Sequence, residues 1–122
     1  EAVDTRNASD AAPAILYRSE RHGDCTYTIP VKAGRRCTVD LHFAETYYAA
    51  RGQRIFNVQI NGRTVLDHFD IFAAAGGRDR AVVEKFAGIA PDAHGDIVVR
   101  LLSGAADQPA ICGIRLVESP VE

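Results

Sequence analysis

Apolar and polar residues alternate with a period of two along much of the chain. Residues 37–43 place apolar side chains at every second position, with Asp40 and His42 on the intervening face. This pattern is typical of a strand that covers a core on one side, so His42 is expected to meet solvent or the edge of a second sheet. Residues 56–60 repeat the alternation, and Asn61-Gly62 follows at once. Because both central residues of a type I′ turn need positive φ, this pair predicts a hairpin.

Further short strands are predicted between clusters of turn-forming residues, at residues 14–18, 26–31, 64–66, 81–86, 96–102 and 110–117. Helical periodicity is weak, and only a short helical turn is expected, within residues 46–50 or 72–76. Many short strands without a long helix predict an all-β, antiparallel sandwich or barrel. We expect this domain to span residues 14–118, with an arm or linker at 1–13 and a frayed tail at 119–122.

Composition narrows the functional classes. The 122 residues fit one domain, with 47% hydrophobic and 25% charged residues and a net charge of −2. No basic run favours nucleic acid, and no apolar run is long enough for a membrane span. The chain begins with Glu1, which suggests a piece excised from a larger secreted protein. Frequent alanine and arginine suggest a bacterial genome rich in G and C.

The three cysteines form no Cys-x-x-Cys pair and have no zinc-like spacing with the histidines. Cys112 lies in an apolar run and is expected to be a buried free thiol. Whether Cys25 and Cys37 form a disulfide is left open, and the cysteines do not settle the cellular compartment. His68 and Asp70 lack a third ligand in recognisable spacing, so no metal or other cofactor is predicted.

Two adjacent tyrosines, Tyr47 and Tyr48, follow the strand predicted at residues 37–43. Pyranose rings present C–H faces that pack on aromatic rings, and a phenol adds a hydrogen bond. Neighbouring strand residues point to opposite faces, so both rings face one ligand only if they lie in a loop. The alternative is that one tyrosine belongs to the core and the other to its rim.

Five segments resemble, in order and spacing, the malectin domain (carbohydrate-binding module family 57): residues 16–21 (LYRSER), 41–48 (LHFAETYY), 56–62 (FNVQING), 70–72 (DIF) and 106–114 (ADQPAICGI). The resemblance spans most of the chain, from about Tyr17 to Val117. The resemblance implies a jelly-roll-like β-sandwich that binds carbohydrate on loops at one end and has no catalytic activity. It also implies relatives in the endoplasmic reticulum, in plant receptor ectodomains and in bacterial carbohydrate-active enzymes.

The resemblance assigns roles residue by residue. Tyr47 and Tyr48 match the aromatic pair that stacks on glucose, and Asp107 matches a loop aspartate that hydrogen-bonds sugar hydroxyls. His22 stands where the family has a tyrosine, and another family aromatic is missing around Ala11. An imidazole at His22 both stacks and hydrogen-bonds, and would make binding sensitive to pH near about 6.5.

Glu45, at the end of the strand, is expected either to orient a neighbouring loop or to touch the ligand. The leading hypothesis is a non-catalytic module that tethers a parent chain to an oligosaccharide or polysaccharide, with glucose as a candidate sugar. We expect it to be monomeric and secreted, extracellular or periplasmic, with other domains of the parent chain as partners.

Two rival functions remain open. The first is a structural or protein-interaction module whose sugar site has eroded, which the changed residues at His22 and Ala11 favour. The second is a small hydrolase that uses a pair of carboxylates, drawn from Asp40, Glu45, Asp70 and Glu84. No nucleophile motif, phosphate-binding loop or metal set accompanies these carboxylates, so the hydrolase ranks last.

Overall fold

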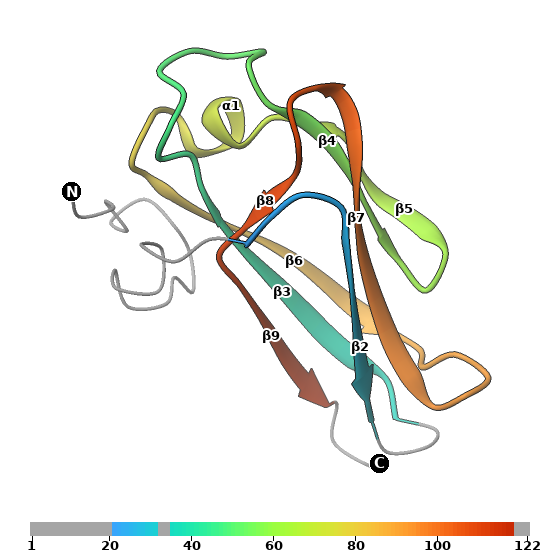
Figure 1. Cartoon of the computed structure of the whole chain (residues 1–122). Coiled ribbons are helices and arrows are strands. Elements are labelled where there is room, and N and C mark those ends of the chain that lie inside the picture. Colours follow the sequence, from blue (N-terminus) through green and yellow to red (C-terminus); the bar gives the residue numbers. More distant parts are fainter. Residues whose placement is uncertain (1–20, 32–34, 119–122) are drawn as a thin grey trace.

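A computed structural model describes residues 21–31 and 35–118 of the chain (Figure 1). This part contains nine strands and one short helix. The elements are β1 (Arg21–His22), β2 (Cys25–Pro30), β3 (Cys37–Ala44), β4 (Ile55–Ile60), β5 (Arg63–Phe69), α1 (Ile71–Ala75), β6 (Ala81–Ile89), β7 (Asp96–Ala106), β8 (Ala110–Ile111) and β9 (Gly113–Glu118). The predicted arm, the strand at 14–18 and the tail at 119–122 lie outside the described residues.

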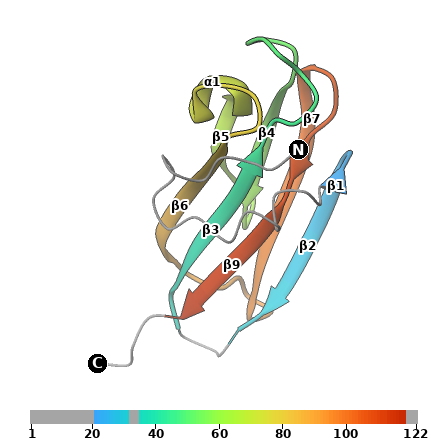
Figure 2. The same ribbon diagram turned by 90° about the vertical axis from the view of Figure 1, so that its left-hand side faces the viewer.

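The strands form two facing sheets, which confirms the predicted all-β antiparallel sandwich. One sheet has the order β2-β7-β4-β5 and the other β6-β3-β9, while β1 pairs with β8. Every one of these described pairings is antiparallel. Apart from the β4–β5 hairpin, consecutive strands belong to different sheets, which gives the chain its jelly-roll-like course. In the turned view β3 lies between β6 and β9 (Figure 2).

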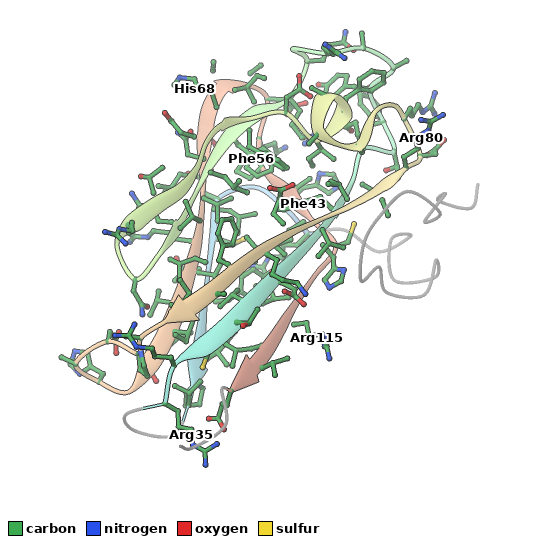
Figure 3. All side chains as sticks on the ribbon, turned by 180° about the vertical axis from the view of Figure 1, so that it is seen from behind. Arg35, Phe43, Phe56, His68, Arg80 and Arg115 are labelled. Atoms are coloured by element: carbon green, nitrogen blue, oxygen red, sulfur yellow. The ribbon has the colours of Figure 1, made fainter. Side chains whose placement is uncertain are left out.

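The core fills the space between the two sheets with the apolar halves of the alternating strands. Three phenylalanines, Phe43, Phe56 and Phe69, pack with ring centroids 4.9–6.0 Å apart. Phe43 and Phe56 point into this space in the view from behind (Figure 3). Other fully buried members are Val39, Leu41, Val58, Ile97, Val99 and Leu101. Period-two alternation therefore identified the core-facing side chains of β3 and β4.

The predicted Asn-Gly hairpin joins β4 to β5. Asn61 and Gly62 both have positive φ, 48° and 79°, as a two-residue turn between twisted strands requires. Asn61 also accepts the Val98 N–H at 2.7 Å and donates to the Ala90 carbonyl at 2.8 Å. Its side chain therefore fastens the hairpin to β7 and to the loop that precedes it.

Of the two alternatives predicted for His42, solvent or the edge of a second sheet, contact with solvent is wrong. His42 is only 3% exposed and Asp40 only 1%, although both alternate with the core residues of β3. β3 is the central strand of its sheet, so side chains of β6 and β9 flank its second face. Lys85 and Arg115 lie 4.0 Å and 3.6 Å from the Asp40 carboxylate. Burial lowers the pKa of His42, because the charged imidazolium is disfavoured there.

The remaining local predictions have mixed outcomes. The helical turn forms at α1, close to the predicted 72–76, whereas residues 46–50 form a loop. Cys25, Cys37 and Cys112 are all free thiols, so the disulfide left open does not form. Cys25 begins β2 and Cys37 begins β3, in different sheets, and Cys112 is only half-buried. Within the described residues, no helix is long and apolar enough to cross a membrane.

Candidate functional site

Two loops meet at one end of the sandwich and bring together Tyr48 and Asp107. The first loop connects β3 to β4, and the second connects β7 to β8, near α1 in Figure 1. The Tyr48 hydroxyl donates a hydrogen bond to Oδ2 of Asp107, although the two residues are 59 positions apart. Both residues were candidates from the sequence, and the fold makes them direct neighbours.

The tyrosine pair lies in the β3–β4 loop. The rings of Tyr47 and Tyr48 are 4.8 Å apart, with an edge-to-face angle of 80°. Tyr47 is 72% exposed, the largest exposed fraction among the large hydrophobic residues described, while Tyr48 is half-buried. Tyr47 is therefore not part of the core, and its ring is available to a ligand. Exposed aromatic rings of this kind suit the C–H face of a sugar.

Glu45 holds the backbone of the tyrosine loop. Its side chain is buried, and Oε2 accepts the N–H groups of Tyr47 and Tyr48, each at 3.3 Å. Oε1 accepts a hydrogen bond from Nε of Arg54 at 2.8 Å. Because a carboxylate has two oxygens with several lone pairs, it satisfies all three donors at once. Glu45 therefore orients the loop in this structure and has no exposed surface to offer a ligand.

Arg54 is a site residue that the sequence interpretation missed. It is 4% exposed, donates from Nη1 to the Gln108 carbonyl at 2.7 Å, and places its guanidinium carbon 5.3 Å from the Tyr48 ring centre. The sequence did contain a signal. Arg54 lies two positions before the core residue Phe56, and Glu45 lies two positions after the core residue Phe43, so alternation directs both side chains inward. Opposite charges at two inward positions predict a buried ion pair.

A bulge in β7 shapes the second loop. Ile55 pairs with Ala106 and Phe56 pairs with Ser103, so the intervening residues of β7 have no partners on β4. One of them is Gly104, where a Cβ would lie 2.6 Å from the Ile55 carbonyl oxygen. Only glycine fits so close to the neighbouring backbone. A bulge of this kind bends its strand, and this one lies just before Asp107.

Asp107 itself adopts a left-handed backbone conformation, with φ of 53°. Its Oδ1 accepts the Gln108 N–H at 2.6 Å, while Oδ2 accepts the Tyr48 hydroxyl. These two hydrogen bonds, with Tyr48 contributing most, lower the pKa of Asp107. The same hydrogen bond raises the pKa of Tyr48, because it stabilises the neutral phenol. At neutral pH the site therefore presents an ionised carboxylate beside an aromatic pair.

His22 lies at the rim of this end of the sandwich. It is exposed on β1, which pairs with β8 so that His22 faces Ala110. The Gly23 N–H also donates to the Pro109 carbonyl at 2.9 Å, which ties β1 to the Asp107 loop. The positive charge of a protonated His22 contributes, as a minor cause, to the lowered pKa of Asp107. His22 thus lies on the side of the site that Asp107 occupies.

Of the four candidate carboxylates of the hydrolase hypothesis, Glu45 lies at this site but is buried beside Arg54, and the other three have different surroundings. Asp40 lies between Lys85 and Arg115, away from the loops. Asp70 caps α1 by accepting the Ala73 N–H, and it also accepts the Gly52 N–H at 2.7 Å. Burial raises the pKa of Glu84, which lies on β6. Among the described residues, no group of three or more His, Cys, Asp or Glu side chains is arranged to hold a metal ion.

A separate hollow of about 480 Å³ lies beside β2 and β9. Its lining is mostly apolar and includes Tyr27, Ile29, Ile111 and Ile114, with Arg21 at its edge. It does not include the tyrosine pair or Asp107. Sugars need convergent hydrogen-bonding groups as well as apolar surface, so the loop end fits a carbohydrate better than this hollow does.

Comparison with known proteins gives a consistent result. The Malectin domain family model matches residues 1–114. Malectin-B of Xenopus laevis is 27% identical over 126 residues, covering 93% of this chain and 46% of that protein. Human malectin is also 27% identical, covering 93% of this chain and 43% of that protein. The chain therefore spans less than half the length of these relatives.

Plant receptors provide further matches. Receptor-like protein 4 of Arabidopsis thaliana is 40% identical over 72 residues, covering 57% of this chain and 12% of that protein. The solved extracellular domain of ANXUR1 from Arabidopsis thaliana superposes with a TM-score of 0.89 at 19% identity, over 98% of this chain and 36% of that one. At such identity the structural match establishes the fold alone. All the relatives named here are from animals and plants, so the bacterial source remains a prediction.

Proposed function

Because this chain belongs to the malectin family of carbohydrate-binding domains, we propose that its loop end binds a glycan without catalysis. The observation that carries the proposal is the meeting of an aromatic pair, exposed Tyr47 and half-buried Tyr48, with the ionised carboxylate of Asp107. Aromatic rings supply the apolar contact to a pyranose, and a carboxylate accepts hydrogen bonds from its hydroxyls.

Each residue has a distinct role in the proposed complex. Tyr47, the exposed ring, stacks on the sugar, and Tyr48 forms the side wall of the platform. Asp107 accepts hydrogen bonds from sugar hydroxyls, which replace one or both of its present donors, the Tyr48 hydroxyl and the Gln108 N–H. His22 supplies a further polar contact at the rim, and Glu45 supports the loop from below without touching the ligand.

The ligand is an oligosaccharide or polysaccharide, and glucose is the first sugar to test because of the family match. A shallow site with few contacts predicts single-site dissociation constants in the range of about 1 μM to 1 mM. A parent chain that carries other domains gains effective affinity by linkage. We place this function outside the cytosol, because two of the structural relatives are an ectodomain and an extracellular domain.

The direct experiment is a titration of the isolated chain with glucans, galactans and pectic fragments, followed by tyrosine fluorescence. The chain has no tryptophan, so a sugar that reaches Tyr47 or Tyr48 changes a signal shared among only four tyrosines. The double variant Tyr47→Ala, Tyr48→Ala should abolish retention on the glycan that binds. Val117→Ala, which trims another exposed apolar residue on β9, should leave retention unchanged.

A structural or protein-interaction role is the second candidate. A structural relative, 17% identical with a TM-score of 0.77, is described as a complex of the plant peptide RALF23 with FER and LLG2. Under this alternative, no glycan changes the tyrosine signal, and a neighbouring domain or peptide binds instead. Turnover of a labelled oligosaccharide by the pure protein would overturn both candidates in favour of an enzyme. Light scattering of the isolated chain tests the proposed monomer.

A further inference from the structure

We infer that Arg54 is a positioning residue, which sets the spacing between the tyrosine loop and the Asp107 loop. The inference rests on the proposed function, because that spacing matters only if both loops touch one ligand. The two loops leave different strands, β3 and β7, of different sheets. The pairing of Ile55 with Ala106 joins the two loops at one end, but none of the described strand pairs fixes the distance between Tyr48 and Asp107.

The three contacts of Arg54 reach both loops. Nε donates to Oε1 of Glu45 at 2.8 Å, and Nη1 donates to the Gln108 carbonyl at 2.7 Å. The guanidinium also lies 5.3 Å from the centre of the Tyr48 ring, within the range of a cation–π contact. A guanidinium directs several N–H groups from one rigid plane, so a single side chain serves both loops at fixed angles.

Glu45 extends this bridge to the tyrosine backbone. Its Oε2 accepts the N–H groups of Tyr47 and Tyr48, while its Oε1 binds Arg54. A continuous path of hydrogen bonds therefore runs from the Gln108 carbonyl through Arg54 and Glu45 to both tyrosines. The side chains of Arg54 and Glu45 are only 3% and 2% exposed. Water competes little there, so these hydrogen bonds couple the loops more strongly than exposed ones would.

The hydrogen bond between Tyr48 and Asp107 lies on the outer side of the same bridge. Gln108, the residue held by Arg54, directly follows Asp107 in the chain. A shift of the Gln108 carbonyl therefore moves the Asp107 carboxylate relative to the Tyr48 hydroxyl. Arg54 acts on the ligand through these two residues, because it is itself buried beneath them.

The test is Arg54→Lys. Lysine keeps the positive charge beside Glu45, but its single ammonium is a point donor on a flexible stem. It does not lie flat beside Tyr48 while bonding both Glu45 and the Gln108 carbonyl. We expect the variant to fold and to bind the glycan found with the wild-type chain about tenfold more weakly, as expected when a hydrogen bond to a charged group is lost.

Arg36→Lys is the matched control. Arg36 donates from Nη1 to the Gly88 carbonyl at 2.9 Å, the same kind of contact that Arg54 makes with Gln108. It precedes β3, whereas the site follows β3, so about 26 Å of strand separates them at about 3.3 Å per residue. This variant should bind the glycan as tightly as the wild-type chain.

A readout that needs no sugar separates positioning from plain stabilisation. In protein with ¹³C-labelled tyrosine, the pKa of Tyr48 should fall toward its ordinary value in Arg54→Lys. The hydrogen bond to Asp107, the largest cause of the raised pKa, loosens, while lysine keeps the positive charge that opposes it. The amide resonance of Gln108 should shift as well, while Arg36→Lys changes neither. A role in stability alone would lower the urea midpoint but leave the Tyr48 pKa and the affinity of the folded protein unchanged.

The outcomes keep the two proposals apart. A wild-type chain that retains none of the glucans, galactans or pectic fragments refutes the proposed function, and the tyrosine resonances still decide the positioning role. An unchanged Tyr48 pKa and Gln108 resonance in Arg54→Lys refute the positioning role, whatever the glycan result. Undiminished glycan binding by Arg54→Lys would refute it equally.

Discussion

Replacing Arg54 by methionine removes the cation from an ion pair that is almost completely enclosed. The side chains of Arg54 and Glu45 are 3% and 2% exposed, and Nε lies 2.8 Å from Oε1. Methionine fills much of the same volume, so the change isolates the charge and the hydrogen bonds from simple packing. It leaves the Glu45 carboxylate buried without its charged partner.

The expected cost follows from that burial. Removing one partner of a buried ion pair costs about 3–5 kcal/mol, because the remaining charge is uncompensated. Glu45 keeps two backbone donors, the N–H groups of Tyr47 and Tyr48, but each lies at 3.3 Å. We therefore expect a loss near the lower limit, about 3 kcal/mol. Small domains have a total stability of about 5–15 kcal/mol, so the variant should fold but be markedly weakened.

Urea unfolding followed by circular dichroism measures this loss. With a slope of about 2 kcal/mol per molar urea, a loss of about 3 kcal/mol lowers the midpoint by about 1.5 M. The double variant Glu45→Gln, Arg54→Met has no charge at these two positions, and the glutamine carbonyl still accepts the tyrosine N–H groups. It should recover most of the lost stability, as a double-mutant cycle would show.

Two results would refute the reasoning about the buried pair. A loss of unfolding free energy below about 1 kcal/mol in Arg54→Met would mean that water or another group satisfies the Glu45 carboxylate without Arg54. A double variant as unstable as Arg54→Met would mean that the uncompensated charge is not the cause of the loss.

The remaining predictions concern the core, the bulge and pH. Leu101→Ala, at a fully buried position of β7, should cost about 2–5 kcal/mol in urea unfolding, and a smaller loss would mean that the core collapses around it. Gly104→Ala places a Cβ 2.6 Å from the Ile55 carbonyl oxygen, so it should cost about 1–3 kcal/mol and weaken glycan retention, and an unchanged protein would contradict the bulge geometry. Two hydrogen bonds lower the pKa of Asp107, so its carboxylate is ionised above the ordinary aspartate pKa of about 3.9. Its contribution to glycan binding is lost only as the pH falls through the lowered pKa. Glycan retention should therefore lose this contribution only below about pH 4 in a retention assay, and a loss at higher pH that persists in Asp107→Asn would show that another group controls binding.

The strands and the turn of the β4–β5 hairpin followed from the sequence because their signals are local. Alternation marks the face of a strand that turns inward, and positive φ at Asn61 and Gly62 belongs to the turn itself. The same alternation carried the information for Glu45 and Arg54, which are polar residues at inward positions. It failed for His42, because whether the second face of a strand is covered depends on its neighbours.

The site depends on contacts between distant parts of the chain. Tyr48 and Asp107 were each candidates from the sequence, yet their hydrogen bond joins residues 59 positions apart. His22 lies near Asp107 only because β1 pairs with β8. Alternation marks Arg54 and Glu45 as inward-facing, but it does not show that Arg54 also reaches the Gln108 carbonyl, which lies 54 positions further along the chain.

The sequence by itself determined the all-β class, the core-facing side chains of β3 and β4, the hairpin turn and the position of the two tyrosines just after β3. These features depend on side-chain periodicity and backbone preference over a few residues, and such preferences are encoded locally. Only the tertiary structure decided which strands are central, which polar groups are buried, and how the two loops meet at Arg54. Those properties come from long-range strand pairing, whose geometry depends on the whole sandwich rather than on any one segment.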